Sequence, residues 1–381
     1  MFESTKRVWA TIDSSAFRKN LTIVSQLCPT SKIFPVVKSN AYGHGVEKMA
    51  KVAVGSSSNV AGLAVATIQE AIELHKFELG HPILLMNGFV NQEELSLCIE
   101  LNFEIVLHAY YQVELVLEVM QKKPINKTIR FWVKMNSGMN RLGMLADDCQ
   151  KALTILKSAP NTEIVFMTHL AYADDMNEPE SRSFTDKQLE RFAKAEGIFY
   201  KESNENLETS IAASAGILTL PETHRDYVRP GVMLYGSSPL AKRNGEDLGL
   251  YPVMTLSSRL ISINRVLAGE GIGYNATYVC EKNTKVGTVS VGYGDGYPRS
   301  ARNGTPVLVK TSSKTFRTKV IGRVSMDMIT VDLTGIDNVQ INDEVLLWGE
   351  GLAADEVAAH AGTIAYELFC KVTKRVPLVY V

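Results

Sequence analysis

The 381-residue chain lacks several features that mark specialised classes of protein. Its 40 lysine and arginine residues nearly balance its 41 aspartate and glutamate residues, and no long run carries one sign of charge. This balance argues against binding to nucleic acid or to a membrane surface. No stretch reaches the roughly 18 consecutive apolar residues that a membrane helix needs, and the polar residues 1–7 contain no apolar signal core. We therefore expect a cytoplasmic protein.

Cysteine is also scarce. The five cysteines are odd in number, widely spaced and without a CxxC pair: Cys28, Cys98, Cys149, Cys280 and Cys370. This pattern predicts reduced thiols, with no disulfide framework and no metal site. Internal repeats, low-complexity tracts and a GxGxxG nucleotide fingerprint are absent as well. What remains is an ordinary globular composition, 45% hydrophobic and 21% charged, in a chain long enough for two domains.

Short apolar runs alternate with longer amphipathic segments through the first part of the chain. Strands are expected over residues 32–38, 61–65, 83–86, 104–107, 129–134, 164–168, 208–211 and 227–229. Helices are expected over residues 67–77, 92–101, 110–121, 147–157 and 185–203, where apolar residues recur at helical spacing. The alternation predicts a parallel sheet, and its eight repeats predict a closed (β/α)8 TIM-type barrel over residues 11–243. A doubly wound open sheet is the alternative fold, although no GxGxxG motif supports it.

The two ends of the chain differ from this pattern. At the start, residues 8–12 predict a short strand, and Ser14 or Ser15 would cap the helix that follows. After a polar linker at residues 241–247, helical spacing largely disappears. Strands are expected over residues 254–263, 285–291, 306–310, 316–321, 328–333 and 345–348, and helices only over residues 353–361 and 363–370. We expect a second, mostly antiparallel β domain over residues 244–381.

Lys38 is the most unusual residue of the expected barrel. It ends an apolar run, and a loop with two glycines follows at once, in the stretch FPVVKSNAYGHG. A lysine at the end of an inward-facing strand must be desolvated or paired. Desolvation lowers the pKa of the amine, which favours a role as Schiff-base nucleophile or proton acceptor. A lone lysine would more often extend to solvent, but the polar, glycine-containing loop beside Lys38 favours a functional role.

Other polar residues also fall where the expected strands end. They are Lys134 to Arg141, His169, Ser214 and Arg229. Catalytic residues of (β/α)8 barrels lie where strands end and the βα loops begin. The sequence therefore predicts that these side chains converge on one mouth of the barrel. There, the glycine of Arg-Pro-Gly-Val would let backbone amides approach an anion.

The stretch VVKSNAYGHG resembles the pyridoxal-phosphate lysine motif of bacterial alanine racemases. The resemblance extends along nearly the whole chain, through KMNSGMNRLG, THLA, RPGV, GIGYNATY and GYGDGY. It implies a homodimeric, fold type III amino-acid racemase that interconverts L- and D-alanine, an isomerase that supplies D-alanine for the bacterial cell wall. It also implies that the N-terminal strand, residues 1–10, joins the β domain, which contributes to the active site of the partner subunit.

The resemblance implies a role for each residue of the barrel mouth. Lys38 would bind pyridoxal 5'-phosphate as a Schiff base. The cofactor phosphate would be held by Tyr42, Ser214, Gly231, Val232 and Tyr366. Arg141 would contact the phenolic oxygen of the cofactor or the substrate carboxylate, and His169 would lie beside the ring. Lys134 would orient Arg141, in some members as a carbamate. The chain departs from the family pattern at Ala213, where many members have asparagine, and at Ser137, where threonine is common.

Arg229 indicates the type of reaction. An arginine keeps its proton at working pH, so against the pyridine nitrogen it would donate a hydrogen bond and leave that nitrogen unprotonated. Most pyridoxal enzymes place a carboxylate there, which stabilises the protonated ring as an electron sink. An arginine should weaken the delocalised carbanion, which favours rapid reprotonation at Cα over transamination or decarboxylation.

Racemisation needs proton transfer on both faces of a planar carbanion, so a second base is expected besides Lys38. The resemblance assigns this role to Tyr274 of the partner subunit. A tyrosine pKa near 10 would have to be lowered, and Arg265 or Arg323 is the cation that we expect nearby. The resemblance also assigns the substrate entrance and the carboxylate side, across the dimer, to Tyr293, Met326 and Asp327.

The sequence leaves three alternative functions open. A racemase of broader specificity, for serine or lysine, shares most of these motifs. A decarboxylase on the same barrel is disfavoured by Arg229. A non-catalytic pyridoxal-phosphate carrier would resemble the barrel alone, whereas this chain continues into a long β domain.

Overall fold

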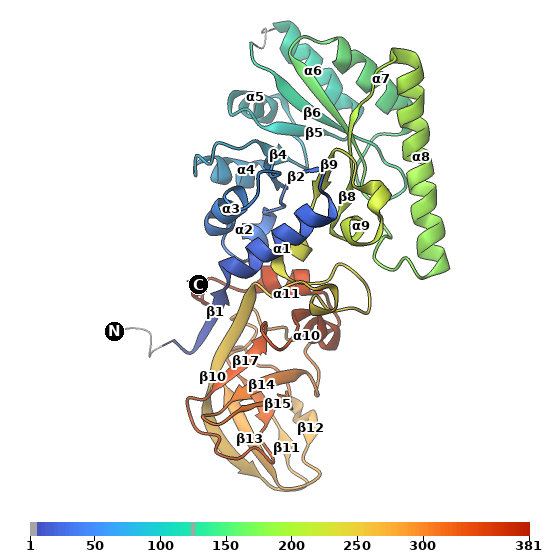
Figure 1. Ribbon diagram of the computed structural model, residues 1–381. Helices are drawn as coiled ribbons and strands as arrows, with labels where there is room; N and C mark the ends of the chain where they lie inside the picture. The colour runs from blue at the N-terminus through green and yellow to red at the C-terminus, as the bar shows by residue number, and fades with distance from the viewer. Residues whose placement is uncertain (1–5, 123–125) are drawn as a thin grey trace.

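The structure is a computed structural model that describes residues 6–122 and 126–381. Figure 1 shows an α/β barrel above a β-rich region, with a helix near the C-terminus, α11 (Ala365–Lys371), between them. Among the described residues, no helix combines the length and the hydrophobicity that spanning a bilayer would require.

Eight strands form the barrel. They are β2 (Lys32–Ile33), β3 (Leu63–Val65), β4 (Ile83–Leu85), β5 (Glu104–Leu107), β6 (Ile129–Lys134), β7 (Thr162–Met167), β8 (Glu208–Ala213) and β9 (Tyr227–Arg229). All pair in parallel in the order β2-β9-β8-β7-β6-β5-β4-β3. Two further parallel bridges, Ile33 with Val60 and Val36 with Ala64, connect β2 to the β3 side and close the sheet. The predicted (β/α)8 barrel is confirmed.

The strand predicted over residues 32–38 is shorter in the structure. Only Lys32 and Ile33 belong to β2, because Pro35 has no N–H with which to continue the ladder. Val36 still makes one bridge to Ala64, so the chain stays against the barrel wall. Lys38 therefore follows an interrupted strand.

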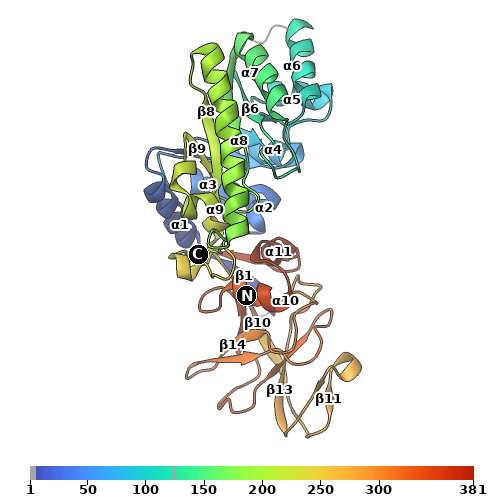
Figure 2. The ribbon, with the colours of Figure 1, turned by 90° about the vertical axis from the view of Figure 1, so that its right-hand side faces the viewer.

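Helices cover the outside of the barrel, as Figures 1 and 2 show. They include α1 (Ser14–Leu27), α3 (Val46–Val54), α4 (Ile68–His75), α5 (Gln92–Glu100), α6 (Tyr110–Lys122), α7 (Ala146–Ser158) and α8 (Pro179–Ser203). The predicted cap of α1 was wrong: Asp13 accepts the N–H groups of Ser15 and Ala16 through Oδ1, and both candidate serines lie inside the first turn. Helix α8 begins earlier than predicted because Pro179 fits the first helical turn, where its missing N–H is not needed.

The β-rich region is organised around the long strand β10 (Met254–Val266). Its main sheet has the order β15-β14-β17-β10-β1-β18, and β13 also pairs with β10. The strands are β1 (Val8–Ile12), β13 (Thr284–Val289), β14 (Pro306–Lys310), β15 (Thr315–Lys319), β16 (Ile329–Asp332), β17 (Glu344–Trp348) and β18 (Leu378–Tyr380). The predicted mostly antiparallel β domain is confirmed, and strand β1 from the start of the chain pairs with β10 inside it. Strand β18, at the C-terminal end of the chain, was missed by the prediction.

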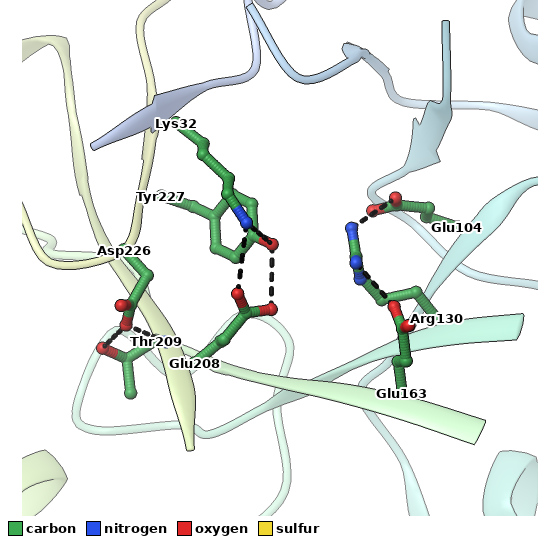
Figure 3. A network of polar contacts seen from close by, with 8 residues as sticks. All are labelled: Lys32, Glu104, Arg130, Glu163, Glu208, Thr209, Asp226 and Tyr227. Carbon is green, nitrogen blue, oxygen red and sulfur yellow. Dashed lines mark hydrogen bonds and ion pairs between the residues drawn. The ribbon is translucent and has the colours of Figure 1, made fainter. Parts of the chain in front are cut away.

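A polar network holds the amino ends of the barrel strands together (Figure 3). Arg130 lies 3.1 Å from Glu104 and 2.5 Å from Glu163, so it joins the starts of β5, β6 and β7. Lys32 and Tyr227 both contact Glu208, which joins β2, β8 and β9. These ends lie opposite the carboxyl ends that carry Lys38 and Arg229. The network therefore lies at the end of the barrel whose residues contribute to stability and not to catalysis.

Candidate active site

The carboxyl ends of the barrel strands surround a cavity of about 790 Å³. Its wall includes Lys134 and every barrel-mouth residue that the sequence predicted: Lys38, Tyr42, Arg141, His169, Ser214, Arg229, Gly231, Val232 and Tyr366. Tyr366 reaches the cavity from α11, so the β-rich region closes one side of it. The prediction missed Met86 and Asn87, which follow β4 and also line the cavity. The strand-end rule that identified Lys38 would have found them.

Lys38 opens a short turn, α2 (Lys38–Tyr42), with an unusual backbone. Ser39, Asn40, Ala41 and Tyr42 all have φ between 52° and 55°, in the left-handed region. Such a conformation costs roughly 1–2 kcal/mol for each L-residue. The turn is held by side chains, since Glu70 accepts the Ser39 N–H at 2.7 Å and Asn40 accepts the Val46 N–H at 2.8 Å. Burial, followed by the charge of Arg141, lowers the pKa of Lys38.

Arg229 is buried at the end of β9, where its guanidinium bonds to the neighbouring strands. Nη2 donates to the carbonyls of Thr168 at 2.8 Å and Ile211 at 3.2 Å, and Nη1 donates to the hydroxyl of Ser210. Among the described residues, the hydrogen bonds that Arg229 donates come from Nη1 and Nη2, so Nε–H is available to a bound group. Burial lowers the pKa of Arg229 to about 10, so the side chain stays charged at neutral pH. Ser210 was missed by the prediction, because it follows Glu208 and Thr209 in the polar half of β8 and nothing in the sequence distinguishes it.

Two further titratable groups share this positively charged cavity. Burial, with the charges of Arg229, Arg141 and Lys38, lowers the pKa of Lys134 to about 8. Burial and the same arginines also place the pKa of His169 well below its usual value, so the imidazole stays neutral. A cluster of cations with this geometry favours binding of an anionic group.

The loop that carries Arg141 is fixed at its base. The Asn136 N–H donates to the Met144 carbonyl, and the Met144 N–H donates to the Lys134 carbonyl at the end of β6. The Asn136 carboxamide accepts the N–H groups of Gly138 and Asn140. Ser137, the residue that replaces a common threonine, is buried against Thr168 with 2.8 Å between the hydroxyl oxygens. Gln188 of α8 donates to the same Ser137 hydroxyl at 3.1 Å. The Ser137 hydroxyl therefore has hydrogen-bond partners on both the β7 and the α8 sides of the loop, Thr168 and Gln188.

Ser214, Gly231 and Tyr42 form a narrow cradle at one end of the cavity. The Ser214 hydroxyl accepts the Gly231 N–H at 2.9 Å. A Cβ on Gly231 would lie 2.7 Å from the Tyr42 hydroxyl oxygen, closer than real Cβ atoms approach. Only glycine therefore lets the backbone at this position come so near to the tyrosine. Backbone amides and two hydroxyls in such a cradle are suited to a phosphate group.

The residues predicted from the β domain lie apart from this cavity in a single chain. Tyr274, Tyr293 and Met326 are 70%, 39% and 52% exposed, and neither they nor Asp327 line the cavity wall. Arg375 joins the two loops that carry Tyr293 and Met326, with 2.8 Å to Asp327 and 3.3 Å to Asp295. The structure therefore brings together the barrel set of predicted residues and leaves the β-domain set on the surface.

Comparison with known proteins places the chain in a family. Residues 12–239 match the family model of the alanine racemase N-terminal domain, and residues 253–380 match that of the C-terminal domain. The chain belongs to the alanine racemase family. It is accordingly an isomerase, and enzymes of this family depend on pyridoxal phosphate.

Individual alanine racemases resemble the chain over almost their full length. The alanine racemase of Vibrio vulnificus (strain CMCP6) is 41% identical over 98% of this chain and 99% of its own. The catabolic alanine racemase of Pseudomonas putida is 41% identical over 98% of both chains. A crystal structure of the biosynthetic alanine racemase from Pseudomonas aeruginosa superposes with a TM-score of 0.90, at 39% identity and 99% coverage of both chains.

The cavity of this alanine racemase fits the family's cofactor. The cradle of Ser214 and Gly231 would suit the phosphate, and Lys38 would offer an amine of lowered pKa to the aldehyde carbon. Arg229 would offer a charged donor to the ring nitrogen. Ala213, where many members carry asparagine, lines the cavity as well.

Proposed function

We propose that this alanine racemase is a homodimer that interconverts L- and D-alanine by a two-base mechanism. Lys38 moves a proton at Cα on one face of the substrate, the D-side, and Tyr274 of the partner subunit moves a proton on the other face, the L-side. The observation that carries the proposal is the shared cavity of Lys38 and Arg229, in which a lysine of lowered pKa lies among fixed cations.

Each residue of the cavity has a distinct task in this proposal. Pyridoxal phosphate, when bound, supplies the electron sink that makes Cα acidic. Lys38 anchors the cofactor and then accepts or returns the Cα proton, which its lowered pKa favours. Arg229 donates to the ring nitrogen and keeps it unprotonated, since its own pKa of about 10 leaves it charged. Arg141 binds an oxygen anion of the cofactor or the substrate carboxylate.

The cradle residues hold the cofactor in place. Ser214 presents its hydroxyl hydrogen and Val232 its backbone amide to the phosphate, beside Gly231, whose own N–H donates to the Ser214 hydroxyl oxygen. Tyr42 and Tyr366 add their hydroxyls. The two tyrosine rings lie 6.0 Å apart between centroids, so both face the same end of the cavity. His169 lies beside the ring and stays neutral, and therefore adds no further positive charge there.

Lys134 is proposed to orient Arg141. Carbamylation needs a neutral amine, and a pKa of about 8 gives Lys134 a substantial neutral fraction near neutral pH. Labelling with ¹³C-bicarbonate would produce a carbamate resonance in the wild type that is absent from Lys134→Met. Equal spectra would contradict the modification.

The homodimer accounts for the residues that a single chain leaves on the surface. Tyr274 is 70% exposed and Met326 is 52% exposed, a poor arrangement for apolar side chains in an isolated monomer. In the proposed dimer these residues, with Tyr293 and Asp327, cover the cavity mouth of the other subunit. They form the substrate entrance and the side that faces the substrate carboxylate.

Mixed dimers test the shared site. Lys38→Ala should abolish both the visible absorbance of the Lys38-bound cofactor and racemisation, and Tyr274→Phe should abolish racemisation alone. Random mixing of the two proteins should restore about one quarter of wild-type activity, since half of the dimers are hybrids and each hybrid has one intact site. The matched control is Tyr200→Phe. Tyr200 is also an exposed tyrosine but lies on α8, so this variant should keep full activity. Recovery of no activity in the mixture would overturn the proposal.

Specificity for alanine over serine or lysine is tested by initial rates on a panel of L-amino acids. A small substrate is expected, because Tyr366 narrows the cavity beside Tyr42. A higher kcat/KM for serine or lysine would assign the broader racemase instead. The match of both domains to the family models removes the carrier and decarboxylase alternatives.

We also propose a cytoplasmic location. The described cysteines are free, and four of the five are buried, an arrangement that suits a reducing compartment. Activity in the cytoplasmic fraction after gentle lysis is the expected result, and activity in the periplasmic fraction would contradict it.

A further inference from the structure

The left-handed turn that follows Lys38 needs support from outside its own backbone. Four consecutive residues, Ser39 to Tyr42, hold φ values near 50° that L-residues disfavour. A conformation of this kind persists only where surrounding groups determine it. Since Lys38 begins the turn, whatever holds the turn also sets the direction of the lysine.

His44 is the side chain that reaches back onto this turn. Its Nδ1 lies 2.7 Å from the carbonyl oxygen of Tyr42 and 3.1 Å from that of Ala41. Both partners are acceptors, so Nδ1 must carry the hydrogen and donate it. The imidazole thus bonds directly to two residues of the left-handed turn.

The rest of the His44 ring is enclosed by apolar surface. The side chain is fully buried, with Tyr235 at 4.6 Å and Phe369 at 5.1 Å between ring centroids. Nε2 is buried without a hydrogen-bond partner among the described residues. Leaving this acceptor unpaired is unfavourable, and an apolar ring of similar size would avoid it. The feature of histidine that this position uses is therefore the donor at Nδ1.

The same residue also contacts the β domain. Phe369 belongs to α11, which carries Tyr366, and the Tyr380 hydroxyl of β18 donates to the His44 carbonyl at 3.3 Å. Gly45 permits this approach, because a Cβ there would lie 1.9 Å from the Tyr380 hydroxyl. His44 is thus one of the residues through which the lysine turn contacts the second domain.

We propose that His44 is a positioning residue for Lys38. Its Nδ1–H holds the left-handed turn, and its ring and carbonyl dock that turn on α11 and β18. This inference rests on the proposed role of Lys38 and adds the group that directs it.

Two substitutions separate the donor from the ring. His44→Phe keeps a ring of similar size and removes the donor, whereas His44→Asn keeps a donor at the Nδ1 position and removes the ring. For His44→Phe we expect kcat and cofactor affinity to fall about 10- to 100-fold, as for a lost buried hydrogen bond. We expect amide exchange at residues 39–46 to accelerate in both the apo and the cofactor-bound protein. His44→Asn should unfold at a lower temperature yet recover part of the kcat.

Controls distinguish positioning from general loss of stability. Arg130→Met destabilises the opposite end of the barrel. Even if its melting temperature falls as far as that of His44→Phe, its amide exchange at residues 39–46 and its kcat should stay unchanged. Wild-type exchange and kcat in His44→Phe, or a His44→Asn protein no better than His44→Phe, would overturn the inference. Exchange in the apo protein reports on the turn independently of racemisation. An inactive wild type would therefore refute the proposed function without deciding the role of His44.

Discussion

Replacing Gly231 with alanine adds one methyl group at the narrowest point of the proposed phosphate cradle. Its Cβ would lie 2.7 Å from the Tyr42 hydroxyl oxygen, 3.5 Å from Tyr42 Cζ and 3.9 Å from the Ser214 hydroxyl oxygen. The tyrosine has little room to withdraw, because it is 6% exposed and its ring packs on Tyr235 with 4.7 Å between centroids. Either the ring or the backbone must therefore shift.

The size of the effect follows from this packing. Adding a methyl group to a filled site costs typically 1–3 kcal/mol, so Gly231→Ala should lower the unfolding free energy of the apo protein by roughly that amount. Displacing the hydroxyl and the amide also removes one or two hydrogen bonds to the phosphate. A hydrogen bond to a charged group contributes about 1.5–3 kcal/mol, so losing one should lower cofactor affinity about 10- to 100-fold, and losing both should lower it further.

Urea unfolding of the apo protein and cofactor titration by absorbance measure the two effects separately. Gly197→Ala, on α8, adds the same methyl where nothing lies within 4 Å, and should raise stability by about 0.5–1 kcal/mol. The double variant Gly231→Ala, Tyr42→Phe lacks the clashing hydroxyl, so the nearest atom to the new methyl is the ring Cζ of residue 42 at 3.5 Å. Its stability should return to the wild-type value while its cofactor affinity stays low. Wild-type stability and affinity in Gly231→Ala would refute the close-packing argument. Recovery of affinity in the double variant would show that the Tyr42 hydroxyl does not hold the phosphate.

Three further predictions concern charged groups. In the apo protein the pKa of Lys134 is lowered to about 8, so between pH 8 and about 10.5 the unfolded state binds more protons, and stability should rise with pH. In urea unfolding, the unfolding free energy of the wild type should rise by roughly 3 kcal/mol more over this pH range than that of Lys134→Met. Unfolding free energies of the two proteins that change in parallel with pH would contradict the prediction. Arg130→Met leaves Glu104 buried without its cation and should cost roughly 2–4 kcal/mol, with cofactor affinity unchanged. Asp355→Asn disrupts a half-buried carboxylate of α10 (Ala354–Ala361) that accepts from Ser237, Ser238 and Gly245. It should cost roughly 1–3 kcal/mol, seen as a lower unfolding temperature in differential scanning calorimetry.

The predictions made from sequence were most reliable where a residue type is costly at its position. Lys38, Arg229 and Lys134 stand at the ends of apolar strands, and parallel strands bring their carboxyl ends to one edge. The periodicity of the chain predicted the closed barrel and the mostly β second domain for the same reason, since each depends on local patterns of burial. Errors came at element boundaries, as at Asp13 and Pro35, where one backbone N–H decides where a helix or strand begins.

Contacts between distant segments could not be predicted in this way. The left-handed turn after Lys38 depends on Glu70, on the imidazole of His44 and on Tyr380 at the far end of the chain. Ser210 accepts a hydrogen bond from Arg229 only because folding makes β8 and β9 neighbours, with Ser210 opposite Tyr227 and Ala213 opposite Arg229. The amino-acid sequence by itself determined the periodic elements and the reactive side chains, since both reflect local burial and chemistry. The direction of the Lys38 side chain was decided by the tertiary structure alone, because it depends on groups that folding brings together from both domains.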